Sequence, residues 1–592
     1  MALETLRRRT SAQILHVPAQ DVLTSLGIFT ISLAAFLPFA PLDPDPQHDG
    51  AHFTVALAIA EGWRVHADVG SGYGPVTALL HGILLESISP KLLVLRVFNS
   101  ILLAGVAASA YGISRLLSIR RLPALLLSLV WVLLSPAWGV FADALPLWPW
   151  PSVLFTLCAQ LSVFLLLLAL RGSKTGPLLF SASAFASLAV MIRANQGVPF
   201  VLSLLLAFLV APQGRQLLQR HKWTLALGAI APQLLLLTYL QTIGALQAAI
   251  HDTLIGPISS YLLDDLDPTS RVTAPINLPA LLIEVYAMAS LPFLLIACGV
   301  LIVLVRWTWS TRSLVAFAAV ATVLGLAFAS IGYYGLPRSI YEALPGEKLP
   351  LATLNALGVT PLYSAAVGIV MAGMVWIIAA IRERQWPLSL AATTVLFASL
   401  SFTTQLVPRW DVYHLWWTGP LMLITCFYFI TRHLNGPQQI VMACVISLPY
   451  GLLATYSWYN TLTADRVAIS DGPLQGMQVL RDRKPIVSNL SRSLAVIPER
   501  SAYFMCDDGM VAAFNGIFLS DRPNYVQVGW SNQPKPNQEP SFIVTCVDSP
   551  QDVIDTESRI PDNYQLIDGP IRMDLSPWSQ TELRIYGNNS VS

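Results

Sequence analysis

The stretch of residues 22–52, "VLTSLGIFTISLAAFLPFAPLDPDPQHDGAH", gives the clearest indication of the fold. Its first part, residues 22–40, has no charged side chain and is long enough to cross a bilayer core of about 30 Å. Directly after it the chain gathers three aspartates and two histidines, namely Asp43, Asp45, Asp49, His48 and His52. A membrane span that ends in a cluster of carboxylates raises the question of what those carboxylates do there.

The whole chain has the composition of a polytopic membrane protein. Of its 592 residues 54% are hydrophobic and 12% are charged, and the mean hydropathy is +0.59, whereas a soluble domain has about 25% charged residues. The formal net charge of +1, without a basic stripe, argues against a nucleic-acid partner. Residues 1–21 are basic and precede an apolar run that lacks a cleavage site, so we expect a cytoplasmic N-terminus and a retained first span.

Hydropathy predicts an all-α membrane region of thirteen spans over residues 22–462. The predicted spans begin near Val22, Leu92, Pro123, Pro151, Pro177, Gly197, Trp223, Pro279, Ser313, Ala356, Leu388, Trp417 and Pro437. With the N-terminus inside, Arg and Lys fall in the cytoplasmic loops, and the acidic stretches "DPDPQHDG", "ADALPLWPWP" and "YLLDDLDPTS" fall outside. We therefore expect a multi-pass protein of a bacterial inner membrane.

Residues 463–592 differ in texture and predict a small extracytoplasmic α/β domain. Short β-type runs such as "SAYFM", "YVQVGW", "SFIVTCV" and "ELRIYG" are separated by Pro, Asn, Asp and Gly. Cys506 and Cys546 both lie here, in an oxidising compartment. They are candidates for a disulfide worth about 4 kcal/mol, and two buried thiols are the alternative.

Ionisable side chains gather at the outer ends of the predicted spans rather than at their centres. Glu284 and Arg96 are among the few within the spans, and Arg96 is near the start of its helix. This distribution favours chemistry at the outer face over an ion-coupled path through the bilayer. The sequence has no P-loop, no GxGxxG between a strand and a helix and no CxxC, which excludes an ATP-driven pump and a nicotinamide enzyme.

The first outer loop, residues 41–91, predicts two short helices that do not cross the membrane. "DGAHFTVALAIAEG" starts at Asp49 and stops at Gly62, and "GPVTALLHGILLES" has Pro75 at its first turn. Both are too short to span and too apolar to stand in water, so we expect them to lie flat at the membrane interface. Between them "GSGYGP" predicts a tight turn.

These features together resemble the GT-C glycosyltransferases. The resemblance rests on the acidic cluster, the flat helices, "EGWRVHADVGSGYGPVTALL" and, more weakly, "RWDVYH". The chain is similar in particular to the bacterial branch of protein O-mannosyltransferase-like, aminoarabinose-transferase-like and arabinofuranosyltransferase-like enzymes. The resemblance implies an inverting transfer of a sugar from a polyprenyl-phosphate donor to a protein, lipid or glycan acceptor on the outer face, within cell-envelope glycan biosynthesis.

Such a transfer requires a base for the acceptor hydroxyl and cations for the departing phosphate. The candidate bases are Asp49 and Asp45, followed by Asp43, while helix capping is the structural alternative for Asp49. The candidate phosphate ligands are Arg409, Arg193 and Arg338, because the planar guanidinium binds phosphate with two hydrogen bonds. The candidate substrate-binding residues are Asp143, Asp411, His414, His48 and Tyr73.

The same residues leave alternatives open. His48 and His52, four positions apart beside Asp45 or Asp49, are compatible with a divalent metal, but a hydrogen-bonding or capping role is favoured and we expect no cofactor. A transporter or flippase of lipid-linked glycans, and a glycan polymerase or ligase that uses a polyprenyl-diphosphate donor, are the competing functions. The chemical form of the donor distinguishes them.

Overall fold

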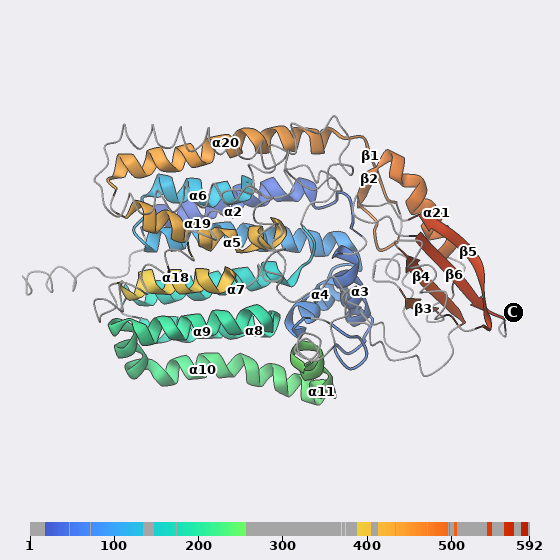
Figure 1. Ribbon diagram of the computed structural model, residues 1–592, viewed down its shortest axis with the longest axis horizontal. Helices are drawn as coiled ribbons and strands as arrows, with labels where there is room; N and C mark the ends of the chain where they lie inside the picture. Colours follow the sequence, from blue (N-terminus) through green and yellow to red (C-terminus); the bar gives the residue numbers. More distant parts are fainter. Residues whose placement is uncertain are drawn as a thin grey trace, which may run out of the picture.

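The computed structural model describes most of the first 255 residues and parts of the remainder. The described residues are 18–45, 48–71, 73–133, 147–172, 174–255, 369, 373, 388–403, 412–432, 434–470, 472–494, 497, 502–505, 541–547, 560, 562–572 and 582–589. The long helices lie side by side in a bundle, and the shorter helices and the strands lie beyond one end of it (Figure 1). That end of the bundle holds the acidic stretch after the first span.

The described bundle helices each overlap one predicted span, although the helix of residues 212–242 begins well before the predicted start near Trp223. They are α2 (Ala19–Phe36, continued by η1, Leu37–Phe39), α5 (Leu92–Leu116), α6 (Arg121–Leu133), α7 (Pro151–Ala169), α8 (Thr175–Ile192), α9 (Ala194–Val210), α10 (Pro212–Thr242), α18 (Leu390–Phe402), α19 (Val412–Thr431) and α20 (Gly436–Thr463). The predicted spans near Pro279, Ser313 and Ala356 lie outside the described residues. The count of thirteen therefore stays a prediction.

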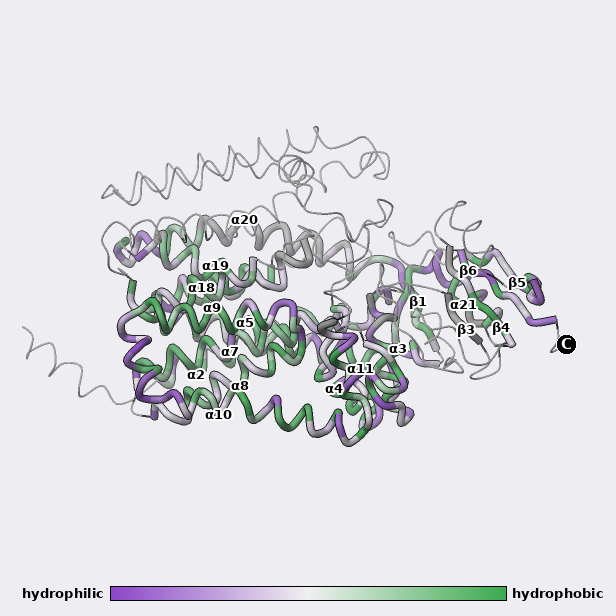
Figure 2. The backbone as a smooth tube through the Cα atoms, turned by 60° about the horizontal axis from the view of Figure 1, so that its bottom comes forward, coloured by the Kyte–Doolittle hydropathy of each residue, from purple (hydrophilic) through white to green (hydrophobic). Residues whose placement is uncertain are grey.

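Five of the described helices, α2, α5, α7, α8 and α10, are long and apolar enough to cross a membrane. Apolar residues run along the bundle, and hydrophilic ones gather at its ends (Figure 2). On α10 the side chains of Trp223 and Leu235 are 73% and 75% exposed, which in water would cost free energy and in lipid would not. A mostly helical fold with several apolar helices is that of a membrane protein.

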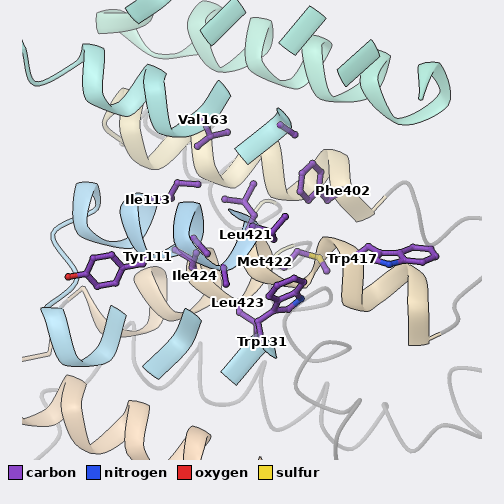
Figure 3. Packing of buried hydrophobic residues seen from close by; sticks show 14 of the residues in the cluster. Tyr111, Ile113, Trp131, Val163, Phe402, Trp417, Leu421, Met422, Leu423 and Ile424 are labelled. Atoms are coloured by element: carbon purple, nitrogen blue, oxygen red, sulfur yellow. The ribbon is translucent and has the colours of Figure 1, made fainter. Parts of the chain in front are cut away.

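The interior of the bundle is held by large aromatic and aliphatic side chains from α5, α6, α7, α18 and α19 (Figure 3). Trp131 on α6 stacks on Trp416 of α19, with ring centroids 4.9 Å apart. Each indole N–H donates to the other residue's carbonyl, at 2.7 and 3.1 Å. Each buried indole N–H thus has a hydrogen-bond partner, as a low-dielectric interior requires.

Charge at the start of α2 is neutralised by two neighbouring helices. Asp21 is buried and forms ion pairs with Arg115 at 3.2 Å and Arg121 at 2.8 Å, and it accepts a hydrogen bond from Tyr111 at 3.0 Å. Because α2 runs the length of the bundle from Asp21 to the acidic stretch, this cluster lies at the opposite end from the candidate site (Figure 1).

The two short helices of the first outer loop are present where the sequence predicts them. They are α3 (His48–Ala60) and α4 (Pro75–Ser87), which pack against each other at the end of the bundle. The side chains of α3 from Phe53 to Ala58 are all buried. Side chains such as Leu474, Met477 and Leu490 from the C-terminal part of the chain belong to the same apolar cluster. Protein therefore covers the middle of α3, and the expected position of both helices at the membrane interface stays a prediction.

Beyond the bundle the described residues form short helical segments and two sheets. They comprise α11 (Leu246–Ile250), the π-helical turn η3 (His251–Ile255), β1 (Arg466–Ala468), β2 (Gln478–Leu480), η6 (Arg481–Arg483), α21 (Lys484–Leu494), β3 (Ala502–Met505), β4 (Phe542–Val547), β5 (Tyr564–Arg572) and β6 (Glu582–Asn588). Strands β1 and β2 pair with each other, and the second sheet has the order β3-β4-β6-β5, with only β3 and β4 parallel. Cys506 lies outside the described residues, so the disulfide stays a prediction, as does the domain boundary at residue 463.

Candidate functional site

The three aspartates that follow the first span are buried together. The exposed fractions of Asp43, Asp45 and Asp49 are 4%, 1% and 0%. Carboxylates are almost never buried unless they are paired, because transfer of a charge out of water is costly. The structure therefore places these side chains inside the protein, where cations or hydrogen-bond donors must hold them, and not in bulk solvent.

Arg96, near the start of α5, holds Asp49 and the turn that leads to it. Its side chain is fully buried, and its Nε donates to Oδ1 of Asp49 at 2.9 Å while Nη2 donates to Oδ2. The same guanidinium donates to the backbone carbonyls of Leu42 and Asp43. A single buried cation thus fixes the position of the acidic stretch relative to the bundle.

Both carboxylate oxygens of Asp49 are engaged. Besides Arg96, the backbone N–H of Asp45 donates to Oδ2 of Asp49 at 2.7 Å. Burial raises the pKa of the Asp49 carboxyl, whereas the charge and hydrogen bonds of Arg96 oppose that rise and the nearby Asp45 charge adds to it. Because Arg96 and the Asp45 N–H bind both oxygens of this carboxylate, the geometry suits Asp49 for holding the loop.

Asp43 is held from the other side by the C-terminal part of the chain. Nε and Nη2 of Arg466, on β1, donate to Oδ2 of Asp43 at 3.1 and 2.8 Å. The exposed fractions of the two side chains are 5% for Arg466 and 4% for Asp43. Asp43 has φ of 44°, a left-handed conformation that non-glycine residues adopt at a cost.

A second charged centre forms where helices α8 and α9 meet. Arg193 is the single residue between them, and its φ of −146° and ψ of 94° interrupt the helical path. Its side chain is 5% exposed, donates from Nη1 to Oγ of Ser152 at the first turn of α7, and lies over the ring of Tyr73 with 5.0 Å to the centroid. Two of the predicted site residues, Arg193 and Tyr73, are therefore brought together.

Aromatic rings connect this centre to the acidic stretch. His52, one helical turn after Asp49, has its ring 5.4 Å from Tyr73 and 4.7 Å from Trp150. Trp150, which precedes α7, stacks on Trp417 of α19 at 5.9 Å. The rings come from α3, the turn before α4, the segment before α7 and α19, so four separate parts of the sequence form one aromatic cluster beside a buried guanidinium.

Gly74 allows the turn that carries Tyr73 to reach Arg193. Its backbone N–H donates to the carbonyl of Ile192 at 3.1 Å. A Cβ atom at this position would lie 1.8 Å from the carbonyl oxygen of Met191, a distance that no side chain tolerates. The glycine-rich turn predicted from the sequence therefore serves a close approach between backbones.

Several predicted site residues cannot be placed. Arg338, Arg409, Asp143 and Asp411 lie outside the described residues. His48 and His414 lie on the described backbone of α3 and α19, but their side chains do not belong to the described part. Among the described residues, no group of three or more His, Cys, Asp and Glu side chains could hold a metal ion.

Sequence reasoning missed the arginine partners of the acidic stretch. An arginine at the start of a span signals the need for an anion, but nothing local assigns Arg96 to Asp49. Arg466 gave no signal at all. A third pairing was also missed: Nδ1 of His66, a buried residue with φ of 62°, contacts Oδ2 of Asp252 in η3 at 2.9 Å.

No protein-family model and no curated protein matches this chain. Among solved structures it is similar to ArnT from Cupriavidus metallidurans bound to undecaprenyl phosphate, with a TM-score of 0.44 and 12% identity over 96% of this chain and 97% of that one. It is also similar to the Archaeoglobus fulgidus oligosaccharyltransferase, with a TM-score of 0.44 and 11% identity over 84% of this chain and 64% of that one.

The archaeal oligosaccharyltransferase AglB from Archaeoglobus fulgidus, in complex with an inhibitory peptide and a dolichol-phosphate, gives a TM-score of 0.44 and 12% identity over 88% of this chain and 69% of that one. These neighbours are GT-C glycosyltransferases, the class that the sequence resembles. At TM-scores below 0.5 and such low identities the likeness assigns no residue role and no substrate. The function must be argued from the site.

Proposed function

We propose that this protein is an integral-membrane glycosyltransferase that moves a sugar from a polyprenyl-phosphate donor to a hydroxyl acceptor on the extracytoplasmic face. One observation carries the proposal: a buried set of carboxylates and a buried guanidinium lie at the same end of an apolar helical bundle, joined by aromatic rings. A lipid-linked donor needs this position, because its phosphate and sugar must meet the protein while its tail stays in the bilayer.

Asp45 is the proposed base. Asp45 is 1% exposed and lies between Asp43 and Asp49, whose carboxylates bind Arg466 and Arg96. The backbone of Asp45 is fixed on both sides, because its N–H donates to the Asp49 carboxylate and its carbonyl accepts from the Asp49 N–H at 3.0 Å. A base that is held before substrate arrives loses little entropy in the transition state. Asp45 takes the proton of the acceptor hydroxyl as that oxygen attacks the anomeric carbon.

Arg193 is the proposed ligand of the departing phosphate. A buried guanidinium binds phosphate more strongly than an exposed one, because water competes less. The Tyr73 ring beneath it and Ser152 beside it fix its orientation. Arg338 and Arg409 are proposed to complete the cation set from parts of the chain that the structure does not describe.

The aromatic cluster is the proposed sugar contact. Sugar rings stack on aromatic faces through their C–H groups, and the rings of Tyr73, Trp150 and His52 lie between the acidic stretch and Arg193. His48, His414, Asp143 and Asp411 are proposed as further ligands of sugar hydroxyls. An inverting course, a bacterial inner membrane, an outer-facing C-terminal part and a role in cell-envelope glycan synthesis belong to the same proposal.

The test is transfer by the purified protein in lipid nanodiscs. Radiolabelled polyprenyl-monophosphate sugars and polyprenyl-diphosphate glycans are offered in parallel with a hydroxyl acceptor mixture. Asp45→Asn is expected to lower kcat about 10²-fold or more, since general base catalysis contributes that much. Asp465→Asn is the matched control, because Asp465 is an exposed carboxylate paired with Arg481.

Three results would contradict the proposal. Transfer only from the diphosphate donor would identify a polymerase or ligase. Movement of the lipid-linked glycan across the membrane without formation of a glycosidic bond would identify a flippase. Full activity in Asp45→Asn would remove Asp45 from the role of base.

A further inference from the structure

The C-terminal part of the chain forms backbone hydrogen bonds with residues 41–43, at the start of the acidic stretch. The backbone N–H of Gln478, on β2, donates to the carbonyl of Pro41 at 2.6 Å, and the N–H of Asp43 donates to the carbonyl of Gln478 at 2.7 Å. Leu42 and Gln478 form a parallel bridge. Residues 41–43 thus form a single β-bridge with β2, and β1 and β2 lie beyond one end of the bundle (Figure 1).

Arg466 adds a side-chain contact to this backbone pairing. Its guanidinium donates twice to Oδ2 of Asp43 and once to the carbonyl of Thr461, the latter near the end of α20. The ion pair is almost fully buried, which weakens screening by water. Arg466 therefore connects three segments, the end of α20, β1 and the acidic stretch.

Asp43 is held through its backbone N–H, its carbonyl and carboxylate oxygen Oδ2. Its N–H is bound by Gln478, its carbonyl by Arg96 and its carboxylate by Arg466. It keeps a left-handed φ of 44°, a conformation that persists only where the surroundings enforce it. Two residues later lies Asp45, the proposed base, so a relaxation of residue 43 to negative φ would move Asp45.

We infer that Arg466 is a positioning residue for the transfer reaction: with the β1 and β2 hairpin it holds Asp43 in the left-handed conformation that directs Asp45 to the acceptor. This inference rests on the proposed function. On this inference the C-terminal part of the chain does more than cover the site, because it holds the acidic stretch in position. Arg466 touches no substrate and acts through the backbone of residues 43–45.

The first experiment compares Arg466→Met and Arg466→Lys with Arg481→Met. Arg481 follows β2 directly and forms an exposed ion pair with Asp465, at 2.6 Å, so its loss is the matched control. Per folded molecule, Arg466→Met is expected to lower kcat about tenfold or more while KM for the donor changes less than about threefold. Arg466→Lys restores part of kcat, because it keeps the charge without the planar fork.

A second pair of variants separates conformation from charge. Asp43→Gly and Asp43→Ala are each combined with Arg466→Met, so that neither protein contains the ion pair. Glycine adopts positive φ freely and alanine does not. The glycine double variant is therefore expected to retain about tenfold more kcat than the alanine double variant. Equal kcat in the two would overturn the inference.

Amide hydrogen exchange of residues 41–50 decides the matter independently of activity. Arg466→Met is expected to speed exchange there, and Arg481→Met to leave it unchanged. If the unmodified protein transfers no sugar but the exchange differs as expected, the proposed function is wrong, while the role of Arg466 in holding residues 41–50 is confirmed. If the unmodified protein is active and Arg466→Met changes neither kcat nor exchange, or lowers only the melting temperature, Arg466 is not a positioning residue.

Discussion

The buried pair of Arg96 and Asp49 gives the sharpest quantitative prediction. Both side chains have 0% exposure, and Arg96 also binds the carbonyls of Leu42 and Asp43. Replacement of Arg96 by Leu leaves a buried carboxylate and two buried carbonyls without this donor. Removal of one partner of a buried pair costs about 3–5 kcal/mol in the free energy of unfolding. We expect that loss for Arg96→Leu.

The double variant Arg96→Leu with Asp49→Leu distinguishes a pair from two independent sites. Because the double variant leaves no buried charge, its loss is expected to be smaller than the sum of the two single losses by about 2 kcal/mol or more. The measurement is unfolding of the purified protein by SDS in mixed micelles, followed by circular dichroism. Additive losses, or a loss below about 0.5 kcal/mol for Arg96→Leu, would refute the reasoning.

The effect of pH on Arg96→Leu follows from the same geometry. Burial already raises the pKa of the Asp49 carboxyl from its usual 3.8, and Arg96 opposes this rise. Without Arg96 the folded-state pKa rises further, so the folded protein binds the proton more tightly than the unfolded chain. The stability lost in Arg96→Leu is therefore expected to be recovered as pH falls through that raised pKa towards 3.8. An unchanged loss across this range would contradict it.

Three further predictions concern the surroundings of the site. Gly74→Ala places a Cβ 1.8 Å from the Met191 carbonyl oxygen, and it is expected to lower kcat and to reduce the free energy of unfolding by about 1–3 kcal/mol. Gly176→Ala is the control, because its Cβ meets no atom within 4 Å and should change neither quantity. Burial lowers the pKa of His81 from 6.5 to about 3, so the unfolded chain takes up the proton first as pH falls. The free energy of unfolding should be full above pH 6.5 and lower by about 2 kcal/mol near pH 5. His81→Leu should remove this dependence in an SDS titration repeated across pH. Arg193→Lys is expected to raise KM for the donor more than Arg215→Lys does, because lysine lacks the planar fork over Tyr73; equal KM values would exclude Arg193 from phosphate binding.

The sequence predicts what depends on neighbouring residues. The start of α5 at Leu92, the proline at the first turn of α4 and the break at Arg193 between α8 and α9 all coincide with local signals of hydropathy and capping. The runs that predict β3, β4 and β6 coincide with those strands. The burial of α3 could not be predicted this way, because residues of the C-terminal part cover it.

Composition and spacing within about 20 residues identify a membrane protein, predict the apolar helices of the described bundle and show three carboxylates after the first of them. Which cation binds Asp43 and which binds Asp49 depends on the tertiary structure. Arg96 is 47 positions from Asp49, and Arg466 is 423 positions from Asp43. Long-range pairing of this kind depends on how helices and strands pack, and a charge pattern along the chain does not contain that information.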